Sequence, residues 1–274
     1  MKKQKPFWLI DNQLSKAQLE VIQKTRLFVA TPAYGGLTTI PYTRSLNSLT
    51  NLSAQVGLPL NTMFLGNESL VQRARNLCVA QFLETDATHL MFIDADVGFN
   101  AKDVLTMILA QKEIIGGNYT KKNINWKRAV EASNNGVPDG SLLHCAGDFV
   151  VRLAKKGESL EVFKPAEVKY LGTVFMLVER SVFDRMKPHV KSYIQNSIAA
   201  AKGRRDYAFF DCDVVNDEYL SEDYWFCHKA LELGMKMYMA PWVHLTHSGT
   251  IEYTGCWPCT NGTVIHDLGQ GKKK

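Results

Sequence analysis

The stretch 88–99, with the sequence THLMFIDADVGF, decides the fold. The run His89–Ile93 is typical of a buried strand, and it ends directly in Asp94-Ala95-Asp96. Two residues separated by one in an extended chain point the same way, and the carboxyl ends of parallel strands line the ligand crevice of an α/β sheet. By spacing alone, the two carboxylates either share a divalent cation, bind a cation and a ribose hydroxyl, or lie as solvated acids at a helix entry.

The residues around this strand alternate between strand-like and helix-like patterns. Short apolar runs predict strands, and apolar residues at helical spacing predict helices, one of them preceded by a capping-box pattern at Ser69 and another by a capping Asn100. The expected order is strand 27–30, helix 69–84, strand 89–93, helix 101–109 and strand 114–115. This alternation predicts an α/β fold with a mainly parallel sheet flanked by helices.

The second half of the chain is less regular. Its patterns predict hairpin strands at 141–153 and 158–164, a long strand at 168–178 interrupted by Gly172, a helix at 222–233 capped by Ser221, and a strand at 235–239. A short amphipathic helix is expected at 15–24. We therefore expect an N-terminal lead-in at 1–25, a single catalytic domain at 26–256 with an antiparallel second half, and a C-terminal tail at 257–274.

The composition limits the class of protein. The chain has 274 residues and a formal net charge of +5, which favours anionic ligands such as nucleotides, phosphorylated sugars or nucleic acid. No apolar run approaches the roughly 18 residues that a membrane span needs. The apolar run Phe7–Ile10 is too short for a secretory signal, so we expect a cytoplasmic protein, in the host cytoplasm if the source is viral.

Six cysteines are dispersed through the chain, which favours reduced thiols. Cys256 and Cys259 have the spacing of a zinc half-site that His247 or His266 could complete, although two thiols in a turn is the preferred reading. A second acidic pair, Asp211 and Asp213, competes with Asp94 and Asp96 for a metal role. Its surroundings resemble a polar loop, so the pair at the end of the buried strand is favoured.

Several blocks, taken in order, resemble the GT-A fold family of nucleotide-sugar-dependent glycosyltransferases, and in particular its small stand-alone viral, phage and bacterial members. The blocks are VATPAYGG at 29–36, ESLVQRARN at 68–76, THLMFIDADVGF at 88–99, IIGGNYTKK at 114–122, YLGTVFMLVERSVF at 170–183 and LSEDYWFCHKALELGMKMYMAPWVHLTHSGTIEYTG at 220–255. The resemblance implies a GT-A-like, Rossmann-like sheet.

The resemblance also implies a metal site. In such enzymes the paired acids bind Mn²⁺ or Mg²⁺, which bridges the donor diphosphate and neutralises the charge that grows on the leaving group. Asp94 and Asp96 match those acids, and His247 matches a late histidine that completes the site, with His244 as the alternative.

A nucleotide-sugar site is implied at the positions that match the family's donor contacts. An aromatic side chain in the first loop can stack on the base, and basic side chains can reach the phosphates. The implied donor-site residues are Thr31, Pro32, Tyr34, Arg75, Asp94, Lys121 with its neighbour Lys122, Gly172 and Thr173.

In inverting members of the family an acid of the Ser-Glu-Asp block acts as general base for the acceptor hydroxyl. Asp223 is the first candidate and Glu222 the second; in a retaining enzyme the acid would hold sugar hydroxyls instead. The expected activity is transfer of a hexosyl or pentosyl group from a nucleotide sugar, with UDP favoured, to a glycan, a glycoprotein or a hydroxylated viral DNA base. A metal-dependent nucleotidyltransferase and a non-catalytic sugar-binding protein are the alternatives. The oligomeric state stays open.

Overall fold

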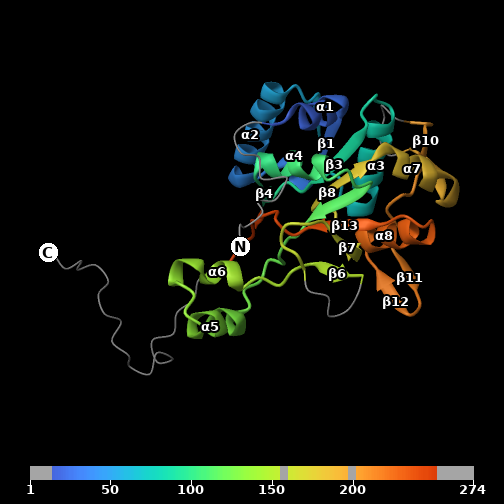
Figure 1. Cartoon of the computed structure of the whole chain (residues 1–274). Helices are drawn as coiled ribbons and strands as arrows, with labels where there is room; N and C mark the ends of the chain where they lie inside the picture. The colour runs from blue at the N-terminus through green and yellow to red at the C-terminus, as the bar shows by residue number, and fades with distance from the viewer. Residues whose placement is uncertain (1–13, 155–159, 197–201, 252–274) are drawn as a thin grey trace.

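The computed structural model describes residues 14–154, 160–196 and 202–251. Its centre is an eight-stranded sheet with the order β2-β1-β3-β8-β5-β13-β7-β6 (Figure 1). The strands in that order are Leu60–Gly66, Leu27–Ala33, His89–Ile93, Phe175–Glu179, Ile114–Gly117, Met237–Ala240, Ala166–Leu171 and Val151–Leu153. Only β8 and β7 run against the other six, so the sheet is mainly parallel.

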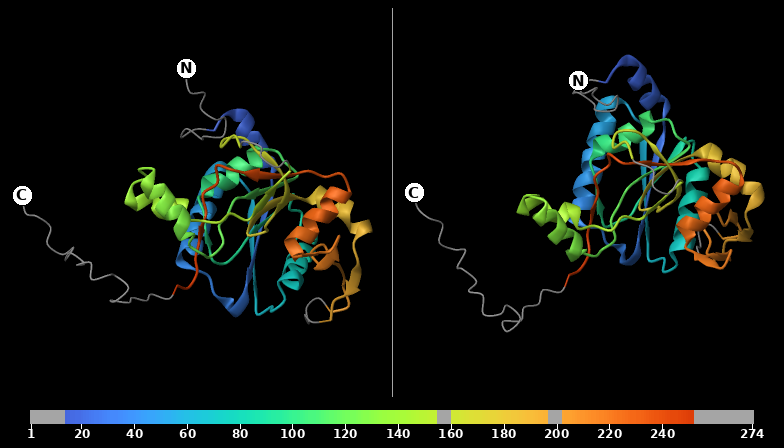
Figure 2. Two further views of the ribbon diagram at one scale, coloured as in Figure 1. Left: turned by 90° about the horizontal axis from the view of Figure 1, so that it is seen from below. Right: turned by 60° about the horizontal axis from the view of Figure 1, so that its bottom comes forward.

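Helices cover both faces of this sheet (Figure 2). On one face lie α1 (Lys16–Lys24), α2 (Ile40–Val56) and α4 (Ala101–Leu109). On the other lie α3 (Val71–Leu83), α7 (Arg180–Met186) and α8 (Glu222–Glu232). The alternation of side chains along each strand divides the core: Leu27 and Val29 face the first set of helices, whereas Phe28 and Ala30 face the second.

Smaller elements complete the described chain. Two antiparallel pairs, β9–β10 and β11–β12, stand apart from the main sheet, and a third pairs β4 with β14. The helices α5 and α6 contact each other and project away from the sheet (Figures 1 and 2). Their bounds are β4 Val97–Gly98, β9 Ser192–Ile194, β10 Arg205–Tyr207, β11 Asp213–Val215, β12 Glu218–Leu220, β14 Thr246–His247, α5 Trp126–Asn134, α6 Leu142–Cys145, and the 3₁₀ turns η1 Tyr34–Gly36, η2 Asp139–Ser141 and η3 Lys187–His189.

The structure confirms the α/β fold class, the strands expected at 27–30, 89–93, 114–115 and 235–239, and the helices α1, α3, α4 and α8. Asn100 caps α4 with its side chain as expected, whereas Ser221 stands at the N-cap of α8 without a side-chain hydrogen bond to the helix backbone. The long helix α2 and the edge strand β2 were not expected from the sequence. Within the described residues, no helix has both the length and the apolar content needed to cross a membrane.

Two expectations for the second half were wrong. The segment 141–153 forms α6 and only the short strand β6, and residues 160–164 are not a strand. The expected long strand at 168–178 is two strands, β7 and β8, which are separated in the sheet by β13 and β5. Residues 172–174 therefore carry the chain across the sheet, from the end of β7 to the start of β8.

Candidate active site

A cavity of about 540 Å³ lies at the carboxyl ends of β1 and β3, a volume within the range of small-molecule sites. Pro32 and Tyr34, from the loop after β1, line one side, and Tyr34 is 75% exposed. Arg75 of α3 and the segment Asp94–Asp96 line another. Parallel strands bring these loops together at one edge of the sheet, as the sequence predicts.

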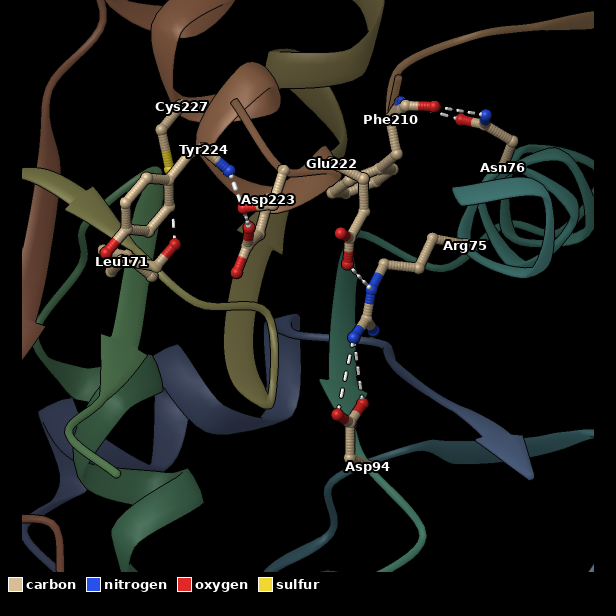
Figure 3. A network of polar contacts seen from close by, with 10 residues as sticks. Arg75, Asn76, Asp94, Leu171, Phe210, Glu222, Asp223, Tyr224 and Cys227 are labelled. Carbon is tan, nitrogen blue, oxygen red and sulfur yellow. Dashed lines mark hydrogen bonds and ion pairs between the residues drawn. The ribbon is translucent and has the colours of Figure 1, made fainter. Parts of the chain in front are cut away.

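Arg75 is the buried centre of the site, with only 4% of its side chain exposed (Figure 3). Its Nη2 donates to both carboxylate oxygens of Asp94, at 3.1 and 3.4 Å, and its Nε donates to Oε1 of Glu222 at 3.2 Å. Its remaining nitrogen, Nη1, is buried and has no hydrogen-bond partner in the structure. One guanidinium thus links the acid at the end of β3 to the first turn of α8.

The first turn of α3 differs from the expected capping box. The helix begins at Val71, and Leu70 stands at its N-cap without a side-chain hydrogen bond. The carboxylate of Glu68 instead accepts a hydrogen bond from the Leu70 amide and binds Arg73. Arg73 therefore points outward, and Arg75, two residues on, points inward, because neighbours at this spacing lie on different helix faces.

Asn76 fixes the backbone just before the second acidic pair. Its Nδ2 donates to the carbonyl oxygen of Phe210 at 2.7 Å, and its Oδ1 accepts from the Phe210 amide at 2.9 Å (Figure 3). The competing acids Asp211 and Asp213 follow immediately, and Asp213 opens the small hairpin β11–β12. Asp211 therefore lies in a loop, whereas Asp213 is the first residue of a strand outside the main sheet.

His247 is brought to Asp96 by the pairing of β14 with β4. Val97 is opposite His247, and the Ser248 amide donates to the Asp96 carbonyl at 2.9 Å. The imidazole Nε2 then lies 3.6 Å from Oδ1 of Asp96. The alternative, His244, packs its ring on His144 at 5.2 Å instead.

The imidazole of His247 is oriented by a backbone carbonyl. Nδ1 lies 2.8 Å from the Thr120 oxygen, which can only accept, so Nδ1 carries the proton of this hydrogen bond. Metal-binding histidines are commonly oriented in this way, because the other nitrogen is left with its lone pair. The hydrogen bond with Asp96 raises the pKa of His247, so a cation competes with a proton there up to a higher pH than at an ordinary histidine.

The donor groups fit a divalent cation in chemistry. Asp94, Asp96 and His247 offer carboxylate oxygens and one imidazole nitrogen, which suit Mn²⁺. Among the described residues, however, no three His, Cys, Asp or Glu side chains are already gathered as a metal site. Asp94 faces Arg75, and Asp96 faces Lys122.

Tyr119 is a site residue that the sequence analysis missed. Its ring packs edge-on to His247, with centroids 5.8 Å apart, and its hydroxyl lies against Gly172. Burial, followed by the negative charges of Asp223 and Asp94, raises the pKa of Tyr119. The phenol therefore stays protonated at neutral pH and keeps a hydroxyl that can donate a hydrogen bond. The one sequence feature linked to the position of Tyr119 is Gly172, whose lack of a side chain leaves room for the Tyr119 ring.

The other residues predicted for the donor site lie in different environments. Thr31 is fully buried, and its hydroxyl is bonded to that of Tyr42 at 2.6 Å, so it supports the loop from below. Thr173 is also buried, and its Oγ1 has no hydrogen-bond partner. Lys121 is exposed, and its backbone amide donates to the Asp148 carbonyl.

The two candidate bases differ in their surroundings. Burial raises the pKa of Glu222, while contact with Arg75 opposes this rise. Asp223 is half-buried, and the hydrogen bonds from the Ser221 hydroxyl and the Tyr224 amide both end on its Oδ1 (Figure 3). Glu222 is thus engaged by Arg75, which leaves Asp223 as the more available carboxylate.

The sheet is mainly parallel, it carries an acid pair at the end of β3, and its antiparallel strands come from the second half of the chain. This is the mainly parallel α/β arrangement that the sequence predicts. The comparisons with known proteins are of three kinds. No protein-family model matches this chain. A search of curated proteins likewise finds no match.

Solved structures do resemble it. A197 from STIV is 16% identical, with a TM-score of 0.48 over 82% of this chain and 87% of that one. GalNAc-T7 with UDP, GalNAc and Mn²⁺ is 10% identical, with a TM-score of 0.44 over 83% of this chain and 44% of that one. A glycosyltransferase involved in the glycosylation of the major capsid of PBCV-1 is 9% identical, with a TM-score of 0.30 over 60% of this chain and 64% of that one. The ligands named belong to those proteins.

Asp96 should make stability depend on pH. Burial acts to raise its pKa, but hydrogen bonds from His247 and Lys122 outweigh this and hold the pKa at about 2. A lowered carboxyl pKa stabilises the fold above the unfolded value near 4, and this contribution is lost as pH falls toward 2. We expect Asp96→Asn to be about 1–2 kcal/mol less stable than the wild type at pH 7.

The difference should vanish between pH 4 and pH 2 in urea-unfolding curves. Asp184→Asn, at an exposed position, is the control and should track the wild type at every pH. A difference for Asp96→Asn that persists unchanged to pH 2 would show that the loss comes from altered shape instead of lost charge.

Gly172→Ala should disturb the floor of the site. A Cβ at this position would lie 2.3 Å from the Tyr119 hydroxyl oxygen and 2.6 Å from a ring carbon, so the buried ring would have to move. We expect a loss of about 1–3 kcal/mol in unfolding free energy. Gly140→Ala is the matched control, because its Cβ would meet nothing within 4 Å. Equal denaturation midpoints for the two variants would mean that Tyr119 is not held in place.

Proposed function

We propose that this protein is a metal-dependent glycosyltransferase that moves a sugar from a UDP-sugar to an acceptor hydroxyl. The observation that carries the proposal is the Arg75 bridge, which joins the acid of a donor-type cavity to the acidic first turn of α8. The phosphate groups of the donor and the acceptor would thus both lie near the buried guanidinium of Arg75. The resemblance of the sequence blocks supports the same activity.

On the donor side, Tyr34 stacks on the base and Pro32 packs beside it. Asp94, Asp96 and His247 hold a divalent cation, which when bound supplies Lewis-acid stabilisation of the leaving diphosphate. Lys121 adds a flexible positive charge near the phosphates. Gly172 lets the backbone approach the sugar, and Thr173 offers its unpaired hydroxyl beneath it.

On the acceptor side, Asp223 acts as general base in an inverting reaction. It accepts the proton of the acceptor hydroxyl while that oxygen bonds to the anomeric carbon and the bond from that carbon to the diphosphate breaks. Glu222 holds Arg75 in place. If the reaction retains configuration, Asp223 holds sugar hydroxyls instead. In either case the acceptor is a glycan, a glycoprotein or a hydroxylated DNA base.

The location in the cytoplasm and the domain boundaries at residues 26 and 256 stay part of this proposal. The thiols of Cys78, Cys145, Cys212 and Cys227 are free, which accords with a reducing compartment. Cys256, Cys259 and His266 lie outside the described residues, so the zinc alternative stays a prediction.

The test is a panel of nucleotide sugars incubated with the protein, with and without Mn²⁺, and scored for the nucleotide released. We expect slow release of UDP from one UDP-sugar, dependent on Mn²⁺. Release of pyrophosphate from a nucleoside triphosphate offered together with a sugar 1-phosphate would favour a nucleotidyltransferase and contradict the proposal. Donor binding without any release, even with acceptors added, would favour a sugar-binding protein. A lack of binding to a nonspecific DNA duplex at low salt would exclude the DNA acceptor and leave the glycans.

A further inference from the structure

Lys122 holds the place beside Asp96 that a divalent cation would need. Its Nζ donates to Oδ2 of Asp96, in a pair of which 42% of the lysine side chain and 31% of the aspartate side chain are exposed. On the opposite carboxylate oxygen lies His247. Both oxygens of Asp96 therefore face a group that can carry positive charge.

The surrounding chain is shaped to admit this lysine. Gly249 has no side chain, and a Cβ there would come within 3.0 Å of Cδ of Lys122. The loop that contains Lys122 also supplies the Thr120 carbonyl that orients His247. One loop after β5 thus both neutralises Asp96 and aligns the predicted imidazole ligand. Lys121 and Lys122 were both predicted near the phosphates, since a linear pattern does not distinguish the two.

We propose that Lys122 is an internal counter-cation for Asp96, which a divalent cation must displace, and that the displaced ammonium then binds the donor diphosphate. This inference rests on the proposed function, because it takes Asp96 as a metal ligand. An oxygen that accepts from an ammonium has less electron density for a metal, and two cations near one carboxylate repel each other. The four-carbon lysine stem is flexible enough to leave Asp96 for a neighbouring anion.

The displacement predicts effects of opposite sign on the two ligands. Without nucleotide, Lys122→Met should bind Mn²⁺ more tightly than the wild type, on the order of tenfold, because the competing charge is gone. With saturating Mn²⁺, the same variant should bind UDP more weakly, on the order of fivefold, because a phosphate contact is lost. A lysine that merely braces Asp96 would weaken both.

The experiment measures Mn²⁺ binding to the full chain by the EPR signal of free Mn²⁺, and UDP binding by calorimetry. Lys127→Met, an exposed lysine of α5, removes the same charge and should leave both affinities unchanged. Lys122→Arg keeps the charge and should stay near the wild type for Mn²⁺. Melting temperatures confirm that each variant is folded.

Two outcomes overturn the inference in distinguishable ways. If the wild type binds Mn²⁺ and Lys122→Met binds it equally or more weakly, the displacement is wrong while the metal-dependent function stands. If neither protein binds Mn²⁺, even with UDP present, the metal dependence of the proposed function fails and the inference fails with it.

Discussion

Replacing Arg75 with methionine should lower the free energy of unfolding by about 3–5 kcal/mol at pH 7, because two carboxylates would lose their buried partner. Only 12% of the Glu222 side chain and 26% of the Asp94 side chain are exposed, so water can replace little of what the guanidinium provides. The guanidinium also stacks over the Phe92 ring at 5.3 Å. Urea unfolding measures the loss.

The stability loss of Arg75→Met should depend on pH, and the sign follows from the same contacts. Burial raises the pKa of Glu222 and Arg75 opposes this rise, so without Arg75 acidification toward pH 4 should protonate Glu222 and reduce the loss. Arg73→Met is the matched control. Its side chain is 40% exposed, against 4% for Arg75, although only 9% of its partner Glu68 is exposed, so the variant should lose less than Arg75→Met, about 1–2 kcal/mol.

The double variant Arg75→Met with Glu222→Gln should recover part of the stability, because an amide in the place of Glu222 carries no uncompensated charge. If Arg75→Met is no less stable than Arg73→Met, the bridge is not a structural element of the site. Its role would then be confined to binding the donor.

Asp223→Asn should lower the turnover number for sugar transfer by about 10²–10⁴-fold, the usual contribution of a general base. An amide keeps the shape and can still accept the hydrogen bonds that Ser221 and Tyr224 direct to Oδ1, so the fold and donor affinity should change little. The measurement is steady-state transfer to an acceptor, with the donor dissociation constant determined separately.

Asp213→Asn is the control, since Asp213 is exposed in the separate hairpin β11–β12 and should have no effect on turnover. Glu222→Gln should act mainly on stability and donor binding, because Glu222 is engaged by Arg75. A turnover number for Asp223→Asn within threefold of the wild type would rule out the general-base role. A change confined to KM would favour a retaining enzyme in which Asp223 holds hydroxyl groups.

The strands and helices with strong periodicity could be predicted from the sequence, whereas two elements could not. The helix α2 buries Tyr42, Ser45, Leu49 and Ser53 against the sheet, and two of these four are polar, so its apolar stripe is weak. The strand β2 lies at the sheet edge with mostly exposed side chains and therefore lacks the apolar run of a central strand. Both are stabilised by tertiary contacts more than by local preference.

Local pattern by itself determined the strand that ends in Asp94 and Asp96, the alternating faces of that strand, and the cap at Asn100, because each depends on neighbours within a few residues. The tertiary structure alone decided which side chains meet. Arg75 closes on Glu222 across 147 residues, Lys122 and not Lys121 reaches Asp96, and Tyr119 fills the space that Gly172 leaves. These contacts depend on strand order and on the crossing from β7 to β8, which side-chain periodicity does not encode.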